Sequence, residues 1–263
     1  MNDGSRSVRR SVVRFVQLAF FRVLFSRCRA VVFHNKDDMN LMRSLGIVSE
    51  RNARVTPGSG KDLDAFPATE APVEPVRFLY LGRLLRSKGV MELLEAAREL
   101  RKSCPTAEVH IAGAIDDNPE SVKEEILREY QASGDVVLHG QVADVGPLLR
   151  QASVFVLPSY REGLPRSALE ALASGRTVIV TDTPGCREVV DAPRYGALVP
   201  ARDSRSLSET MISYAQDPDR IVREGLAARR AAEEKFDVKL VVSLMLDALE
   251  VRSSGPADTA LTP

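Results

Sequence analysis

Residues 154–181 read VFVLPSYREGLPRSALEALASGRTVIVT and decide the fold class. The segment starts with a short apolar run, continues with a helical stretch that Pro165 opens and Gly175 ends, and closes with a second β-rich run. A strand, a helix and a further strand in this order predict a βαβ unit with parallel strands. Both strand runs are apolar on both faces, which is typical of a sheet that helices cover on its two sides.

The same alternation extends over residues 76–235. We therefore expect an α/β fold, a parallel sheet with helices on both faces, followed by three closing helices. The expected strands are Val76–Leu81, Ala107–Ala112, Asp135–His139, Val154–Leu157 and Thr177–Thr181. The expected helices are Val90–Ser103, Glu120–Ala132, Val145–Ala152, Pro165–Ser174, Asp203–Gln216, Asp219–Phe236 and Val238–Val251.

The first 66 residues follow a different pattern. Helical stretches lie at 6–26 and 37–45, and short strand runs lie at 30–33 and 54–56. Residues 57–75 are rich in Pro and Gly without an apolar period, which is typical of a connecting segment. The expected parts of the chain are a small N-terminal segment at 1–66, a linker at 67–75, the α/β domain at 76–235, a last helix at 236–251 and a disordered tail at 252–263.

The composition excludes several classes of protein. The 263 residues carry 36 Lys or Arg and 36 Asp or Glu, so no overall charge favours binding to nucleic acid. The three cysteines, Cys28, Cys104 and Cys186, are widely spaced and form no Cys-x-x-Cys pair. This pattern disfavours a disulfide framework and a zinc site, and we expect a cytoplasmic protein.

The charge is unevenly placed, because residues 1–36 contain eight Lys or Arg residues and one acid. Arg14 and Arg22 interrupt the apolar residues there, so no run of about 18 apolar residues could span a bilayer. Arginines on one side of helix 6–26 and apolar residues on the other fit a helix that lies on an anionic membrane surface. Residues 5–29 are therefore a candidate contact to the inner face of the membrane. The alternative, that this helix packs on the core of a larger first domain, stays equally open.

Three other patterns lack what their chemistry requires. Residues 56–62 resemble part of a P-loop but lack its first glycine and the Ser or Thr after the lysine. Asp62 and Asp64 have no third ligand nearby, so we expect no metal site. His110 and His139 lie within strand runs and are expected to be satisfied core histidines.

Ligands of open parallel sheets bind at the carboxyl ends of the strands. The loop after the first strand of the sheet carries Arg83 and Lys88, and Gly82 and Gly89 permit it to be tight. Arginine offers a planar fork for phosphate oxygens and lysine a mobile point charge, so the two cations suit a diphosphate. The alternative is a solvated basic loop.

The loop and helix quoted first supply the second group of candidates. Glu162 lies at the expected mouth of the crevice, and Glu170 lies roughly 7.5 Å along the helix from Pro165. Backbone N–H groups of Arg166 and Ser167 would be free at the helix N-terminus, which is a geometry that binds anions. Two carboxylates beside such a site suit sugar and ribose hydroxyls. The alternative is that Glu162 helps to cap the helix and Glu170 is solvated.

These motifs together resemble the retaining family-4 (group 1) glycosyltransferases. The resemblance rests on PSYREGLPRSALEALASG (158–175), YLGRLLRSKG (80–89), VTDTPGCREVV (180–190) and YGALVPARD (195–203), and it covers about residues 30–250. It implies a GT-B type fold, in which two Rossmann-like domains face each other across a cleft. This chain would hold the C-terminal, nucleotide-sugar donor-binding domain and, at 1–66, a remnant of the N-terminal, acceptor-side domain.

The resemblance also implies roles for the candidates. Arg83 and Lys88 would grip the diphosphate, Glu162 would be the catalytic residue at the donor hexose, and Glu170 would contact the ribose. The other implied donor-binding residues are Gly82, Gly163 and Leu164. No metal or other cofactor is implied. The donor would be a nucleoside-diphosphate sugar, a UDP-sugar first of all, and the new bond would keep its anomeric configuration. VVFHNKDD (31–38) and GSGKDLDAF (58–66) resemble members that build surface or capsular polysaccharides on glycan or lipid-linked acceptors.

Two departures from the family pattern bear on activity. Lys61 stands where a small apolar residue is more usual, and the segment before the linker is far shorter than a full first domain. We expect a chain that binds nucleotide sugar but transfers little by itself, and that needs a partner for the missing domain or self-associates. Two alternatives stay open. One is a non-catalytic nucleotide-sugar-binding fragment or subunit. The other is a nucleotide-sugar 2-epimerase, which is disfavoured because no candidate base stands out.

Overall fold

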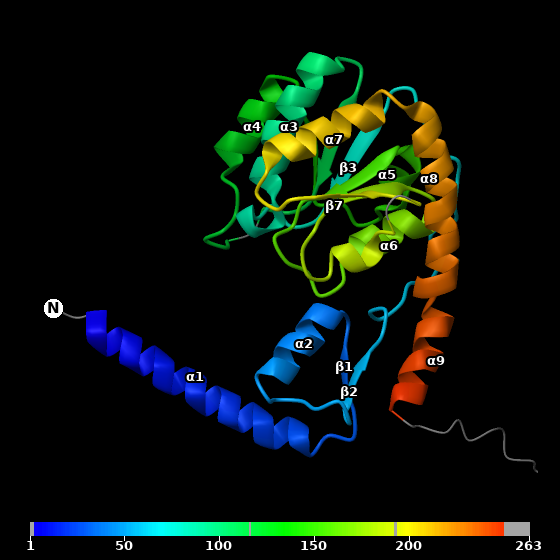
Figure 1. Ribbon diagram of the computed structural model, residues 1–263. Helices are drawn as coiled ribbons and strands as arrows, with labels where there is room; N and C mark the ends of the chain where they lie inside the picture. Colours follow the sequence, from blue (N-terminus) through cyan, green and yellow to red (C-terminus); the bar gives the residue numbers. More distant parts are fainter. Residues whose placement is uncertain (1–2, 116, 192–193, 250–263) are drawn as a thin grey trace, which may run out of the picture.

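The computed structural model describes residues 3–115, 117–191 and 194–249, and its main body is a six-stranded sheet (Figure 1). The strands are β3 (Arg77–Leu81), β4 (Glu108–Ala112), β5 (Val137–Gly140), β6 (Val154–Leu157), β7 (Thr177–Thr181) and β8 (Ala197–Val199). They lie in the order β5-β4-β3-β6-β7-β8, and every neighbouring pair is parallel. The predicted α/β fold with a parallel sheet is therefore confirmed. The sixth strand, β8, is an addition to the five predicted from the sequence.

Helices cover both faces of this sheet. The helix α3 packs against α7 beside α4 on one face, while α5 and α6 lie on the other (Figure 1). Their bounds are α3 (Val90–Ser103), α4 (Glu124–Ala132), α5 (Gly146–Gln151), α6 (Arg166–Ala173), α7 (Ser204–Ala215) and α8 (Pro218–Ala231). Two 3₁₀ turns, η1 (Arg86–Lys88) and η2 (Arg187–Val189), and a π-helical turn, η3 (Ala232–Phe236), complete this part; α9 (Val238–Ala248) follows.

Local contacts explain where helices begin and end. α6 buries its apolar residues completely, and it ends where Gly175 adopts a left-handed φ of +77°. α4 begins at Glu124, four residues later than the sequence predicts, because residues 120–122 instead bond to the loop after β3. There the N–H of Arg86 donates to the carbonyl of Glu120, and the N–H of Val122 donates to that of Leu84. The final helix ends at Ala248, and the predicted tail at 252–263 lies outside the described residues.

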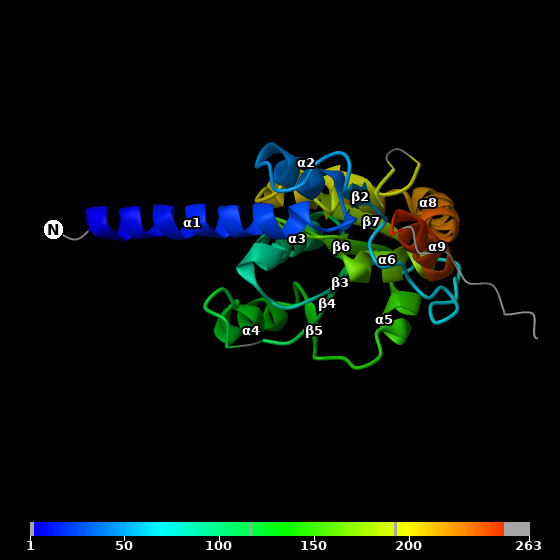
Figure 2. The ribbon, with the colours of Figure 1, turned by 90° about the horizontal axis from the view of Figure 1, so that it is seen from below.

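A smaller unit precedes the main body. It consists of α1 (Asp3–Ser26), β1 (Val31–Phe33), α2 (Lys36–Ser44) and β2 (Ala53–Val55), and its two strands pair in parallel. Among the described residues, its buried core consists of Ile47, Val48 and Ala53, with partly buried neighbours from α1 and α2. The α1 helix projects away from the rest of the chain in both views (Figures 1 and 2). In the described part of the chain, none of the helices combines the length and apolar character that crossing a bilayer would require.

The connecting segment is fastened to the main body at two places. The N–H of Lys61 donates to the carbonyl of Phe236 at 2.7 Å, and the N–H of Val238 donates back to Lys61 at 2.9 Å, which joins the segment to the start of α9. Farther along, the fully buried Arg176 guanidinium donates to the carbonyls of Leu149 and Thr69, each at 2.8 Å. The proposed domain boundaries stay a prediction. Residues 57–75 are hydrogen-bonded to the main body at Lys61 and Thr69.

The two strand histidines are bonded but are not core residues. His110 Nδ1 lies 3.0 Å from His139 Nε2, and His110 Nε2 lies 3.0 Å from Glu108 Oε2. The His110 side chain on β4 is 15% exposed, and His139 is partly buried on the edge strand β5. The prediction of satisfied histidines is confirmed, but neither residue is fully buried in the core.

Gly89 lets the loops after β3 and β6 meet. It has a φ of +71°, and a Cβ at this position would overlap the backbone carbonyl of Pro158. Only glycine combines this left-handed conformation with so close a backbone approach. Because Lys88 precedes Gly89 and Ser159 follows Pro158, the contact brings the two loops together side by side.

We expect Gly89→Ala to lower the free energy of unfolding by about 2–5 kcal/mol, since it adds overpacking to the penalty for a left-handed residue. Gly140→Ala is the matched control: its φ is +65°, and no atom lies within 4 Å of its added Cβ. That change should cost only the backbone penalty, about 1–2 kcal/mol. Urea unfolding of the two variants measures the difference, and equal losses would show that the contact with Pro158 is unimportant.

Candidate functional site

The candidates from both loops line one pocket at the carboxyl edge of the sheet, next to the neighbouring strands β3 and β6. Its volume is about 340 Å³. This is where strand order reverses, so the loops after β3 and β6 diverge to opposite faces and leave a crevice. The predicted residues in the lining are Gly82, Arg83, Lys88, Glu162 and Glu170, and the others are Leu81, Leu157, Pro165, Arg166 and Ser167.

Lys88 and Glu162 form an ion pair across the pocket. Lys88 Nζ lies 2.5 Å from Glu162 Oε1, and the buried Ser159 hydroxyl donates to the same oxygen at 2.8 Å. The Glu162 side chain is only 15% exposed, and a buried carboxylate needs polar partners. Lys88 and Ser159 supply a cation and a hydrogen-bond donor. The alternative of Glu162 as an N-cap of α6 is wrong, because Pro165 occupies that position and no side chain caps the helix.

Glu170 has a partner that the sequence analysis left outside the site. Lys61 Nζ lies 2.6 Å from Glu170 Oε1, and the two side chains are 12% and 16% exposed. The ammonium also lies 4.3 Å from the centroid of the Phe66 ring. The alternative of a solvated Glu170 is therefore wrong. The only signal in the sequence was that Lys61 departs from the family pattern, because 109 residues separate the partners.

Cationic side chains gather at the pocket. Lys61 and Lys88 pair with the two glutamates, and Arg83 and Arg166 also belong to the described lining. The hydroxyl of the buried Tyr80 donates to the Arg83 carbonyl at 2.8 Å. Burial raises the pKa of Tyr80 far above its ordinary value, so its hydroxyl keeps its proton and holds this backbone turn.

Gly163 and Leu164 lie in the same loop but do not line the pocket. The carbonyl of Gly163 accepts a hydrogen bond from Asn35, and the Leu164 side chain contacts Gly58. Both residues thus face the N-terminal unit. Their role in donor binding stays a prediction.

Asp62 and Asp64 form a turn and do not converge on a common site. Asp62 Oδ1 accepts from the N–H of Asp64, whose carboxylate lies 3.4 Å from Lys239 Nζ. Within the described residues, no group of three or more His, Cys, Asp or Glu side chains could hold a metal ion.

A comparison with protein families identifies the chain. The family model described as "Glycosyl transferases group 1" matches residues 75–217. The chain belongs to the group 1 glycosyltransferases. The resemblance to the group 1 glycosyltransferases is therefore confirmed, and the match spans both loops of the pocket as well as α6.

Several curated proteins are similar to this chain over much of its length. The N,N'-diacetylbacillosaminyl-diphospho-undecaprenol alpha-1,3-N-acetylgalactosaminyltransferase of Campylobacter jejuni is 30% identical over 90% of this chain. The putative colanic acid glycosyltransferase WcaL of Escherichia coli is 29% identical over 69%. The chain spans 64% of the length of the first relative and 47% of the second.

Solved structures share the fold. Sucrose-phosphate synthase from Thermosynechococcus elongatus superposes with a TM-score of 0.76 over 89% of this chain and 61% of its own, at 23% identity. HepE of Anabaena, solved with UDP-glucose, has a TM-score of 0.75 over 89% of this chain and 68% of its own, at 19% identity. The sheet and helices are thus those of a GT-B glycosyltransferase, as the motifs predict.

We expect the Lys61–Glu170 pair to couple the N-terminal segment to α6. A double-mutant cycle with Lys61→Met and Glu170→Gln should give a coupling of about 1–2 kcal/mol in the free energy of unfolding, because both side chains are largely desolvated. The same cycle on Lys102 and Glu99, whose side chains are 64% and 55% exposed, should give about 0.5 kcal/mol or less. Equal couplings in urea unfolding would contradict a special role for Lys61.

Proposed function

We propose that this pocket binds a UDP-sugar and that the protein transfers the sugar, with retention of its anomeric configuration, to a glycan or lipid-linked acceptor. The observation that carries the proposal is that one pocket beside the N-terminus of α6 gathers four side chains from three places. Arg83 and Lys88 come from the segment after β3, Glu162 from the loop after β6 and Glu170 from α6 itself. The proposed reaction uses no metal and no other cofactor.

The charges of the pocket match the needs of a diphosphate leaving group. Negative charge develops on the diphosphate as the bond to the sugar breaks, and prepositioned cations stabilise it without reorganisation. Arg83 and Lys88 supply these cations, and no side chain of the described residues accepts from the N–H groups at the N-terminus of α6. Lys88 is held by Glu162 at 2.5 Å, so it can contact the diphosphate while Glu162 accepts from a hexose hydroxyl.

Glu170 suits the ribose of the nucleotide. Its Oε1 is bonded to Lys61, and among the described residues Oε2 has no hydrogen-bond partner. An ionised carboxylate oxygen accepts hydrogen bonds, so this oxygen is available to ribose hydroxyls.

The names of the relatives support the choice of donor and acceptor. HepE was solved with UDP and with UDP-glucose, and the Campylobacter relative is named for transfer to a diphospho-undecaprenol glycan. WcaL is named for colanic acid biosynthesis. We therefore propose a place in the assembly of a surface polysaccharide or lipid-linked glycan.

Titration calorimetry with UDP tests the donor site. Lys88→Met should weaken UDP binding by about 1.5–3 kcal/mol, the range for a hydrogen bond to a charged group. The control Lys102→Met removes an exposed lysine that lies outside the pocket and should leave binding unchanged. A folded wild-type protein that binds neither UDP nor a UDP-sugar would overturn the proposal.

The same preparation separates transfer from its alternatives. A radiolabelled donor with a lipid-linked acceptor reveals transfer, and proton NMR of UDP-N-acetylglucosamine without acceptor reveals a new epimer if the protein is a 2-epimerase. Binding without either reaction would favour a non-catalytic nucleotide-sugar-binding unit, a chain that needs a partner domain, or one that acts only after self-association.

We also propose that the N-terminal unit contacts an anionic membrane, at the inner face of the cytoplasmic membrane. The α1 helix exposes apolar side chains, among them Val16, Phe20 and Val23 at 56–62%. A cavity of about 870 Å³ adjoins its C-terminal end, and its cationic lining is Arg22, Arg27, Arg29, Arg51 and Arg54. Cations beside an exposed apolar helix favour anionic lipid headgroups.

Sedimentation with vesicles tests this contact. The wild type should sediment with phosphatidylglycerol vesicles and not with phosphatidylcholine vesicles, and added salt should release it. The double variant Arg27→Glu/Arg51→Glu should bind about ten-fold more weakly or worse, since each basic residue near the surface contributes about 1 kcal/mol. Equal recovery of the wild type in the supernatant with both lipids would contradict an electrostatic membrane contact.

A further inference from the structure

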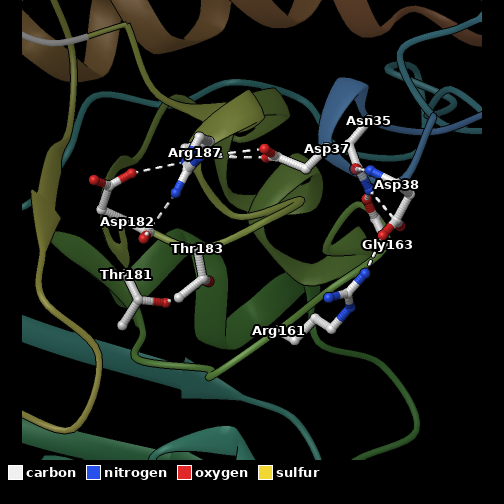
Figure 3. Close-up of polar contacts among 9 residues, drawn as sticks. All are labelled: Asn35, Asp37, Asp38, Arg161, Gly163, Thr181, Asp182, Thr183 and Arg187. Atoms are coloured by element: carbon white, nitrogen blue, oxygen red, sulfur yellow. Dashed lines mark hydrogen bonds and ion pairs between the residues drawn. The ribbon is translucent and has the colours of Figure 1, made fainter. Parts of the chain in front are cut away.

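We propose that the first turn of α2 positions the loop that carries Glu162, and that Asn35 is the main positioning residue. The inference rests on the proposed function, because Glu162 is the residue assigned there to the donor sugar. It gives the N-terminal unit a role besides contact with the acceptor or a membrane: this unit holds the loop 161–164, which carries Glu162, in place. Figure 3 shows the polar contacts of Asn35, Asp37 and Asp38 that support the inference.

Asn35 makes a double connection. Its side chain is completely buried, and its Oδ1 accepts from the N–H of Asp38 at 2.7 Å as the N-cap of α2. Its Nδ2 donates to Asp38 Oδ2 at 2.9 Å and to the carbonyl of Gly163 at 2.8 Å. Both Nδ2 hydrogens and the oxygen are thus used, and the reversed amide would place Nδ2 against an N–H donor.

The neighbours of Gly163 in the loop contact the N-terminal unit and the start of the connecting segment that follows it. Arg161 forms an ion pair with Asp38, and the Leu164 side chain packs on the backbone of Gly58 (Figure 3 shows the first contact). Three of the four residues at 161–164 therefore touch residues 35–58. The fourth, Glu162, is the one that faces the pocket.

A second loop completes the arrangement. The N–H of Glu162 donates to the carbonyl of Pro184 at 3.1 Å, and a Cβ at Gly185 would overlap the carbonyl of Glu162. Arg187 in this second loop lies 3.3 Å from Asp37 on the first turn of α2. The first turn of α2 therefore contacts the 161–163 loop directly. It also contacts, through Arg187, the segment that packs against Glu162 (Figure 3).

The alternative is that Asn35 serves only as the N-cap of α2 and does not position the loop. The two roles use different atoms, so they can be separated. Asn35→Ser keeps an N-cap acceptor of equal quality but is too short to reach Gly163. Asn35→Ala loses the cap as well. Asp217→Ser is the matched control, because Asp217 caps α8 through the N–H of Arg220 and is not among the pocket residues.

The experiment combines calorimetry, thermal unfolding and hydrogen exchange on the full chain. For Asn35→Ser, UDP-glucose affinity should fall about three- to ten-fold, as for the loss of one neutral hydrogen bond, while UDP affinity falls less than about two-fold. Its unfolding midpoint should stay close to that of Asp217→Ser. Without any ligand, amide exchange at residues 159–164 should accelerate in Asn35→Ser and in Arg161→Met, and not in Asp217→Ser.

Each outcome decides the matter. If Asn35→Ser exchanges and binds like the wild type, and only Asn35→Ala differs, the residue is a cap and the inference is wrong. If the wild type binds no nucleotide, the proposed function fails, and the ligand-free exchange at 159–164 still decides whether α2 holds the loop. Equal losses of UDP and UDP-glucose affinity would also overturn the inference, because the effect would not then act through Glu162.

Discussion

The close approach of Gly89 to the backbone of Pro158 is the constraint on which the site depends. Neighbouring strands of a parallel sheet deliver their loops to the same edge, and at β3 and β6 the following helices go to opposite faces. That divergence opens a crevice. A side chain at position 89 would force the two loops apart, and Lys88 would no longer reach Glu162 at 2.5 Å.

The pocket is held together by its own charges. Lys88 with Glu162 and Lys61 with Glu170 form two largely desolvated ion pairs, and each joins residues far apart in the sequence. Such pairs contribute little net stability, because desolvation offsets most of the attraction. The two ion pairs do fix the positions of the four charged groups. A diphosphate entering the pocket would therefore meet cations already in place, which is the arrangement that electrostatic catalysis requires.

The N-terminal unit has a small core of its own in the part of the chain that the structure describes. Its buried cluster there is Ile47, Val48 and Ala53, and α1 projects away from the rest of the chain. It contacts the main body through Asn35 and Asp38 on the 161–163 loop, and the connecting segment that follows it contacts α6 and η3 through Lys61. The contacts of Asn35 and Asp38 fasten the loop that carries Glu162. The N-terminal unit, which lies outside the α/β domain, therefore contacts the loop of the proposed donor site.

The fold class and several of the pocket residues of the main body could be predicted from the sequence. Apolar runs alternating with helical stretches predict a parallel sheet, and position after a strand places Arg83, Lys88, Glu162 and Glu170 at its carboxyl edge. These signals are local, and they follow from periodicity and topology. The sequence did not predict β8, which has three residues, nor the late start of α4, which the loop after β3 dictates. The pairing of Lys61 with Glu170 and of Asn35 with Gly163, across 109 and 128 residues, could be seen only in the folded chain. A hydrogen bond or ion pair needs atoms within about 3 Å, and no local pattern encodes a distance between segments that only the folded chain brings together.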